Sequence, residues 1–271
     1  APGSLPADMT PLDSLAAQLI SKPIMMFGTP ETQITQLTAA AVEAKKKNEE
    51  DDDEEDEQQL PLSTINDPAN LKKIEQRVAT YKPKMMKSPR PGKALLVLDI
   101  DHTLFDSSGV AERAAELARP HLHEFLIGVF QHYDICLWSA TSMSWIELKM
   151  KELGVESLDI IMAYVDIAAM ISIQNDQRGG KLHDCKPLAV LWKLAPSLYG
   201  PTNTIIVDDR SRNFALNPQN GLKIKAFRNC HDLAAKQDTE LMHLKDYLVG
   251  IATTLKSFES LDHSHWRSWH Q

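Results

Sequence analysis

Carboxylate residues follow two apolar stretches that have the pattern of buried strands. The first stretch leads into Asp99 and Asp101, and the second leads into Asp208 and Asp209. A short, continuous apolar run is typical of a strand that is covered on both faces. The carboxyl ends of parallel strands meet at one edge of a sheet, where α/β proteins bind ligands, so up to four carboxylates are expected to converge. Crowded like charges repel, and a cation that prefers oxygen ligands, such as Mg²⁺, would remove this conflict.

Two further segments carry groups that suit an anion. Ser139 and Thr141 follow an apolar stretch and precede a helical pattern, and the N-terminus of a helix attracts anions. We expect Ser139 to contact a phosphate and Thr141 to have a structural role. Lys186 precedes a proline that can begin a helix, and it would supply a positive charge for phosphate.

Each of these groups also has a purely structural interpretation. Aspartates after a strand favour turns and helix caps, and Ser139 could likewise cap a helix. An isolated lysine such as Lys186 is most often a solvated surface charge. The order of the whole set along the chain, with Thr103 two residues after Asp101, favours the functional interpretation.

The elements that must hold these groups alternate between strands and helices. Strands are expected at 94–99, 133–138, 159–164, 170–173, 204–208 and 222–227, and helices at 67–82, 110–119, 120–132, 142–153, 188–194 and 238–255. This alternation predicts an α/β fold, with a Rossmann-like, mostly parallel sheet and helices on both of its faces.

Between about 160 and 185 the alternation is interrupted by short strands and by the hairpin signal Gln177–Gly180. We expect a small β insertion that overhangs the site. Arg178 at its tip could meet a substrate phosphate or acidic residue, or it could be solvated.

The ordered set resembles the haloacid-dehalogenase-type (HAD-like) phosphatases, and within them the branch that acts on the phosphorylated C-terminal domain (CTD) of RNA polymerase II. Further stretches narrow the resemblance to members of this branch that also carry a ubiquitin-like domain: Leu98–Asp106, Arg119–Phe125, Trp138–Thr141, Met150–Val155 and Asn213–Ile224. The resemblance covers roughly residues 71–266. The stretch Ile24–Thr29 looks like the last strand of such a ubiquitin-like domain.

The resemblance implies a role for each residue of the set. Asp99 would attack the phosphorus and become an aspartyl phosphate, and Asp101 would first donate and later accept a proton. The phosphate would be bound by Thr103, Ser139 and Lys186. Mg²⁺ would be held by Asp99, the Asp101 carbonyl and Asp209, with Asp208 as a further ligand or as the holder of a water molecule.

The same resemblance implies a phosphoserine or phosphothreonine protein as substrate, either the polymerase tail or subunits of the proteasome regulatory particle, and a location in the nucleus. Two other functions stay open: a phosphopeptide-docking module, and a receiver-like phosphoaspartate domain without turnover. In a receiver the paired acids come early and the lysine last, whereas Asp208 and Asp209 come last here.

Composition excludes some classes of protein. The chain has 271 residues, 43% of them hydrophobic, and its net charge of −8 is concentrated in the acidic run Glu49–Glu57. The remaining 28 acidic and 29 basic residues nearly balance, so we expect no direct binding of nucleic acid. No apolar run approaches the ~20 residues that span a bilayer, so we expect no membrane segment. Three cysteines suit a reducing intracellular compartment, and we expect a monomer.

Three segments are expected along the chain. Residues 1–30 would be the remnant of a ubiquitin-like domain and 31–65 an acidic, flexible linker. Residues 66–271 would form the HAD-like phosphatase domain, including the β insertion.

Overall fold

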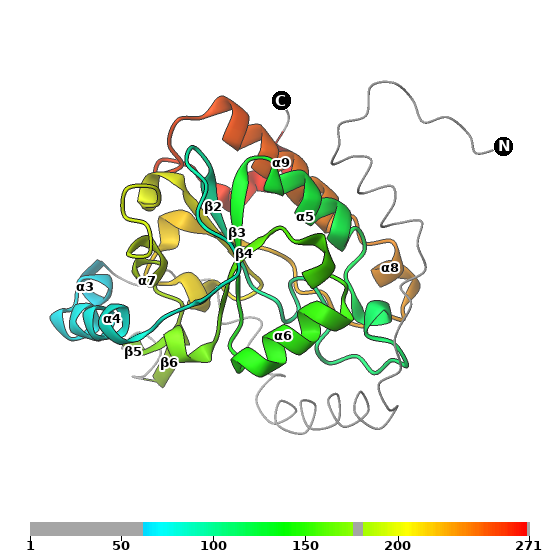
Figure 1. The fold of residues 1–271 in the computed structure, drawn as a ribbon, viewed down its shortest axis with the longest axis horizontal. Coiled ribbons are helices and arrows are strands. Elements are labelled where there is room, and N and C mark those ends of the chain that lie inside the picture. The colour runs from blue at the N-terminus through cyan, green and yellow to red at the C-terminus, as the bar shows by residue number, and fades with distance from the viewer. Residues whose placement is uncertain (1–61, 176–180, 270–271) are drawn as a thin grey trace.

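The computed structural model describes residues 62–175 and 181–269 (Figure 1). The ubiquitin-like remnant, most of the acidic linker and Arg178 are predictions that lie outside these residues. The predicted domain boundaries stay a prediction.

A six-stranded sheet forms the centre of the described fold. Its strands lie in the order β1 (Lys84–Met85), β4 (Ile161–Val165), β3 (Tyr133–Trp138), β2 (Ala94–Leu98), β7 (Thr204–Asp208) and β8 (Gly221–Lys223). All neighbours are parallel except β1, which runs antiparallel to β4. The chain leaves β2 toward β3 and later returns on its other side to β7. The strand order therefore reverses at β2, which is where open α/β sheets bind ligands.

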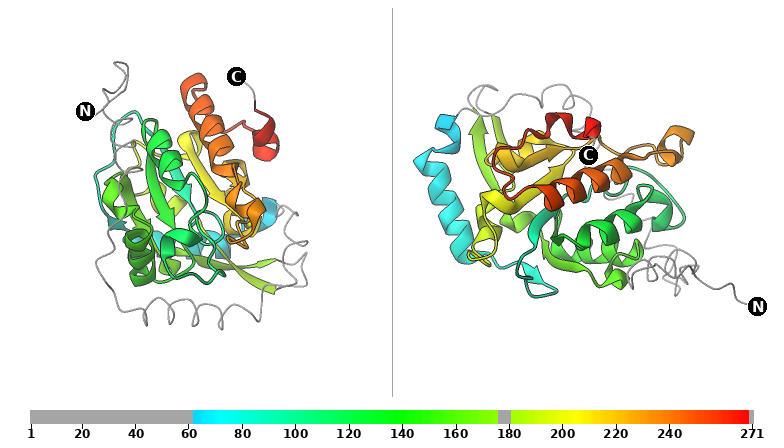
Figure 2. Two further views of the ribbon diagram at one scale, coloured as in Figure 1. Left: turned by 90° about the vertical axis from the view of Figure 1, so that its right-hand side faces the viewer. Right: turned by 90° about the horizontal axis from the view of Figure 1, so that it is seen from above.

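Helices cover both faces of the sheet, as predicted (Figure 2). Alternate residues of β2 point to opposite faces, because the side chains of a strand alternate. Leu96 and Leu98 join the core under α5 (Leu122–Phe130), α6 (Met143–Glu152) and α9 (Glu240–Thr254). Leu95 and Val97 join the core under α7 (Ala189–Trp192), which α4 (Pro68–Thr80) flanks. The remaining short helices are α3 (Leu62–Ile65) and α8 (Leu233–Lys236).

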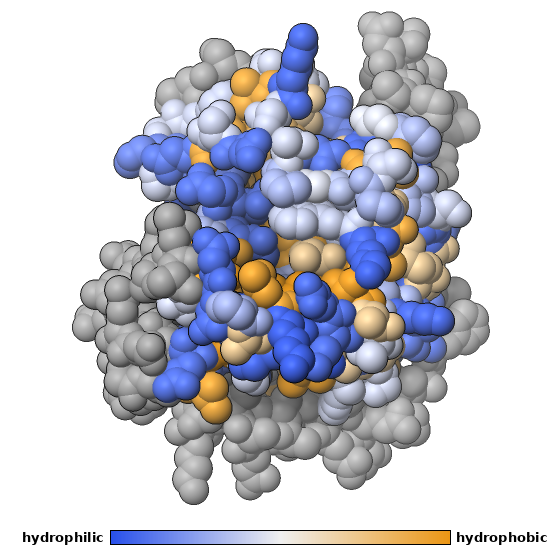
Figure 3. Space-filling view, turned by 90° about the vertical axis from the view of Figure 1, so that its left-hand side faces the viewer, coloured by the Kyte–Doolittle hydropathy of each residue, from blue (hydrophilic) through white to orange (hydrophobic). Residues whose placement is uncertain are grey.

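Helix α4 shows how local sequence sets an element. The side chain of Asp67 accepts a hydrogen bond of 2.7 Å from the backbone N–H of Ala69, and Pro68 occupies the first turn, where it has no N–H to satisfy. The helix ends at Thr80. Its outer surface belongs to a side of the molecule on which hydrophilic residues surround smaller hydrophobic areas (Figure 3).

The β insertion is a separate two-stranded antiparallel sheet of β5 (Ile171–Asn175) and β6 (Lys181–Cys185). Its buried face packs Ile171, Ile173 and Cys185 against Leu216. The strand β4 pairs with β3 in the main sheet. The inserted sheet therefore begins at 171 rather than at about 160.

Two predicted elements are wrong in extent. The helix expected at 110–119 is only a 3₁₀ turn, Ala114–Leu117. Just before it, the Asp106 carboxylate accepts hydrogen bonds from the backbone N–H groups of Ser108 and Gly109, and such local bonds compete with a helix. The strand expected at 222–227 ends at Lys223. Beyond it the backbone N–H of Phe227 donates to the carbonyl of His102, in the turn after β2, so the chain leaves the sheet.

Candidate active site

The predicted convergence of carboxylates is present. The carboxylates of Asp99, Asp208 and Asp209 each offer an oxygen, and these three atoms lie within 4.8 Å of one another. Asp99 and Asp208 are buried, and Asp209 is partly exposed. They meet because β2 and β7 are adjacent parallel strands, and the backbone N–H of Asp99 still donates to Val207 in the ladder.

Lys186 lies between two of these carboxylates. Its Nζ donates to Oδ1 of Asp99 at 2.5 Å and to Oδ2 of Asp208 at 2.6 Å, and its side chain is fully buried. Its backbone N–H donates to the carbonyl of Asn213, which anchors the end of β6 beside the sheet. Burial alone would lower the pKa of Lys186, but the two carboxylates raise it above its ordinary value, so the lysine is charged.

The carboxylates are short of positive charge. Burial raises the pKa of Asp99 to about 7, with Lys186 opposing the shift and Asp208 adding to it. Burial also raises the pKa of Asp209 to about 8, and the nearby Asp208 and Asp99 add to the shift. Both shifts show that this cluster disfavours further negative charge. A hard divalent cation with oxygen ligands fits the donor set, because it would relieve this repulsion.

Asp208 is held more firmly than its neighbours. Its Oδ1 accepts from the backbone N–H of Arg210 at 3.0 Å and from Nδ2 of Asn213 at 2.8 Å, while Oδ2 accepts from Lys186. Asp99 accepts fewer hydrogen bonds: Thr103 donates to its Oδ2 at 3.2 Å, and Lys186 donates to its Oδ1. Asp208 is therefore placed to orient Lys186, and Asp99 keeps more of its oxygen surface free for other chemistry.

Asp101 lies two residues beyond Asp99 and is also held by two donors. Ser139 donates to Oδ2 at 2.9 Å, and Nζ of Lys149 donates to Oδ1 at 2.7 Å. The hydroxyls of Ser139 and Thr141 lie 3.0 Å apart. The predicted site residues from four strand ends thus meet at one edge of the sheet, apart from Arg178, which is outside the described residues.

Lys149 is a site residue that no sequence motif singles out. It lies in the second half of α6, between the buried Ile146 and Met150 in sequence. The one available signal is this helical spacing, since a lysine beside the buried stripe of a helix borders the protein interior.

A tight turn presents Asp101. His102 has a positive φ of 61°, and its N–H donates to the carbonyl of Phe105 at 2.8 Å. Arg119 stabilises this turn, because its Nη1 donates to the Thr103 carbonyl at 3.1 Å. The Arg119 side chain is fully buried and also binds Asp238 through two nitrogens.

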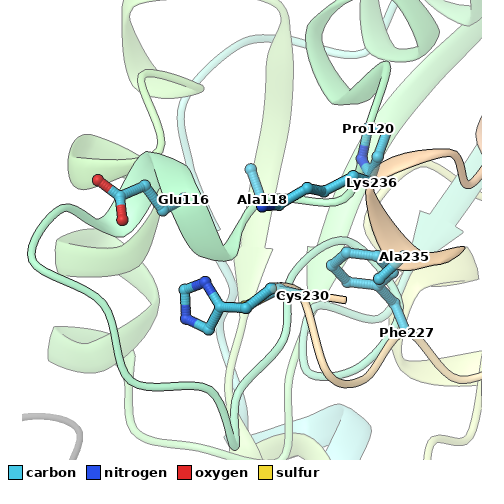
Figure 4. Close-up of a pocket in the computed structure, with 8 residues that line it drawn as sticks. Glu116, Ala118, Pro120, Phe227, Cys230, Ala235 and Lys236 are labelled. Atoms are coloured by element: carbon cyan, nitrogen blue, oxygen red, sulfur yellow. The ribbon is translucent and has the colours of Figure 1, made fainter. Parts of the chain in front are cut away.

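The structure also contains a hollow of about 360 Å³, and Figure 4 draws the residues that line it. Its lining comes from the segment 116–120 and from the segment 227–236, and includes Phe227, Cys230 and Lys236. None of the candidate site residues lines it, so it is separate from the acidic cluster.

The sheet and its edge define the class of protein first: an α/β protein of the HAD-like type, with an acidic cluster and a buried lysine where the strand order reverses. The family model described as NLI interacting factor-like phosphatase matches residues 94–259. The chain belongs to this family.

Curated relatives agree with the family. The ubiquitin-like domain-containing CTD phosphatase of Arabidopsis thaliana is 50% identical over 206 residues, which cover 74% of this chain and 59% of that protein. Ubiquitin-like domain-containing CTD phosphatase 1 of Xenopus tropicalis is 45% identical over 248 residues, covering 91% of this chain and 76% of that protein. The resemblance drawn from the sequence is confirmed.

One solved structure in the comparison is that of Fcp1, an essential RNA polymerase II CTD phosphatase. Its sequence is 14% identical to this chain, and the match covers 74% of this chain and 69% of the Fcp1 chain, with a TM-score of 0.40.

Proposed function

We propose that this chain is a Mg²⁺-dependent protein serine/threonine phosphatase that works through an aspartyl-phosphate intermediate. The observation that carries the proposal is the grouping of Asp99 with Lys186 and Asp209 at the reversal point of the sheet, with Asp101 close by. Asp99 is the nucleophile, because it combines burial, a neighbouring cation and oxygen atoms that few donors occupy.

In the first step an oxygen of Asp99 bonds to the phosphorus while the bond from phosphorus to the serine or threonine oxygen breaks. Asp101 gives its proton to that leaving oxygen. Lys186 and the hydroxyls of Ser139 and Thr103 bind phosphoryl oxygens, and the ammonium group of Lys186 balances their charge.

In the second step a water oxygen bonds to the phosphorus, and Asp101 takes a proton from that water. The bond between phosphorus and Asp99 breaks, which releases phosphate and restores the Asp99 carboxylate. Asp99, Asp209 and the Asp101 carbonyl would hold Mg²⁺, which supplies further charge neutralisation of the transferred group. Asp208 keeps Lys186 in place through its short hydrogen bond.

The substrate is proposed from relatedness. Two relatives are named as CTD phosphatases, so we propose phosphoserine peptides like the tail of RNA polymerase II as substrates. Proteasome regulatory subunits as substrates or partners, a nuclear location and a monomeric state are further proposals that follow from the resemblance alone.

Release of phosphate from a panel of phosphoserine and phosphothreonine peptides, with Mg²⁺ and with EDTA, tests the function. A phosphatase releases phosphate over many turnovers with Mg²⁺ and stops with EDTA. A receiver-like domain would label itself once from a small phosphodonor without turning over peptide. A docking module would bind the peptide and release nothing, and either of these results would contradict the proposal.

A further inference from the structure

Lys149 forms an ion pair with Asp101, the group to which the proposed function assigns proton transfer. Its Nζ lies 2.7 Å from Oδ1 of Asp101, and the two side chains are only 16% and 13% exposed. The ammonium group also lies 5.1 Å from the centre of the Phe105 ring. The pair is thus largely shielded from water. Charges that are shielded from water interact more strongly than charges on an open surface.

The placement of Lys149 follows from how α6 packs. Ile146 and Met150 are fully buried in the core and fix the helix. Lys149 is about 9 Å along the helix from its first residue, Met143. Helical side chains lean toward the N-terminus, so an extended lysine at this position points back toward the strand ends.

Hydrogen-bond capacity explains why the site needs this lysine. A serine hydroxyl has one proton to donate. In the structure Ser139 uses that proton on Oδ2 of Asp101. If Ser139 turns its proton to a bound phosphate, as the proposed function requires, Asp101 loses that donor. Lys149 still donates to Oδ1 and so continues to hold the carboxyl group.

We infer that Lys149 is a positioning residue for proton transfer by Asp101, an inference that rests on the proposed function. The ammonium group keeps Oδ1 as an acceptor, because a protonated carboxyl retains one oxygen without a proton. Oδ2 is therefore the oxygen that gives its proton to the leaving serine oxygen and later takes one from water. The bonds to phosphorus form and break at Asp99, as described above, and Lys149 exchanges no proton.

The test compares Lys149→Met, which keeps the apolar stem but removes the charge, with Lys149→Arg, which keeps the charge. Lys151→Met is the matched control, because Lys151 is an exposed lysine on the same helix. Steady-state kinetics on a phosphoserine peptide give kcat and KM. Inhibition by inorganic phosphate reports direct contact with the phosphoryl group, and thermal melting reports folding.

For Lys149→Met we expect kcat to fall roughly 10-fold to 100-fold, with KM and the phosphate inhibition constant within about twofold of wild type. Lys149→Arg should recover much of the loss, and Lys151→Met should match wild type. In an Asp101→Asn background, assayed with an aryl phosphate, Lys149→Met should change the rate less than about twofold, because Lys149 acts through Asp101.

Three results would overturn the inference. An unchanged kcat in Lys149→Met would remove any role, and a tenfold weaker inhibition by phosphate would assign Lys149 to substrate contact. The role of Lys149 would be structural if Lys149→Arg did not recover the lost kcat and the melting temperature also fell. A wild-type chain that releases no phosphate would instead contradict the proposed function.

Discussion

At the scale of single residues, charge balance explains the site. Asp99, Asp208 and Asp209 carry three negative charges when ionised, and Lys186 supplies one positive charge among them. The deficit of two charges equals that of a divalent cation. When Asp101 is ionised, Lys149 balances its charge. The acidic cluster is therefore suited to a divalent cation, while Asp101 is left for proton transfer.

Replacing Asp99 with Asn should abolish turnover. The amide has nearly the shape of the carboxylate but is not a nucleophile, so we expect phosphate release to fall roughly 10³-fold or more while the circular dichroism spectrum is kept. Asp232→Asn, at an exposed position, is the control and should behave as wild type. Undiminished release by Asp99→Asn would exclude Asp99 as the nucleophile.

At the scale of elements, Arg119 joins three segments that are distant in sequence. Its buried guanidinium donates to the carbonyls of Thr103 and Lys225 and binds both carboxylate oxygens of Asp238, just before α9. The turn that presents Asp101 is thereby tied to the loop after β8 and to the start of a core helix. A single buried side chain thus links the position of the site to the packing of the fold.

Replacing Arg119 with Met should destabilise the protein by about 3–5 kcal/mol, because two carbonyls lose the guanidinium donor and the Asp238 carboxylate loses its cationic partner, although Oδ1 of Asp238 keeps the backbone N–H of Glu240. The variant Arg119→Lys should recover little of the lost stability, since lysine cannot form the bidentate contact with Asp238. Urea denaturation measures the effect. Arg113→Met removes a surface ion pair with Glu116 on the same segment and should change stability by less than about 0.5 kcal/mol. Similar small effects of both substitutions would disprove a role for the Arg119 contacts.

At the scale of the whole molecule, ligand and proton binding act on the stability of the fold. The described residues include two layers of helices around one sheet, and none of their helices is long and apolar enough to span a bilayer. The three cysteines are free and buried, so no disulfide links the described residues. Stability should therefore depend on the acidic cluster and on buried histidine rather than on disulfides.

Magnesium should raise the melting temperature, and more so at higher pH. The raised pKa values of Asp99 and Asp209, about 7 and about 8, mean that the metal-free fold loses stability as pH rises from the unfolded carboxyl value of 3.8 to these values. A bound divalent cation removes that loss, and at a hundredfold excess over its Kd it adds about 2.7 kcal/mol. Thermal melting with Mg²⁺ and with EDTA, at about pH 6 and about pH 8.5, measures the effect. Asp209→Asn should reduce the response, and an equal response in that variant would remove Asp209 from the ligand set.

Acid should destabilise the packing of the C-terminal segment through His263. Burial lowers the pKa of His263 to about 4, with Asp262 opposing the shift, and Nδ1 lies 2.7 Å from the hydroxyl of Tyr247. A depressed pKa means that this stability is present above the unfolded value of about 6.5 and is lost as pH falls toward 4. We expect a loss of about 2 kcal/mol between about pH 7 and about pH 5.

His263→Gln should flatten this part of the pH dependence in urea denaturation, whereas His231→Gln, at an exposed position, should leave it unchanged. An equally steep profile in His263→Gln would place the acid sensitivity elsewhere.

The sequence by itself determined the strands β2, β3 and β7, the start of α4 and the meeting of Asp99 with Asp208 and Asp209. These depend on local hydrophobic periodicity and on the rule that parallel strands end at one edge of a sheet. The resemblance supplied the family and the roles of the motif residues. Each strand pattern and each motif lies within a short stretch of the chain, although the stretches themselves are far apart in sequence.

Only the tertiary structure decided which side chains hold the motif residues in place. Lys149 reaches Asp101 across 48 positions, and Arg119 binds Asp238 across 119. Such contacts depend on how whole helices pack, which no local pattern encodes. The same reason explains why β4 joins the main sheet, whereas the expected helix at 110–119 gives way to a turn beside the local hydrogen bonds of the Asp106 side chain. In each case a contact formed in the folded chain outweighed the local preference of the sequence.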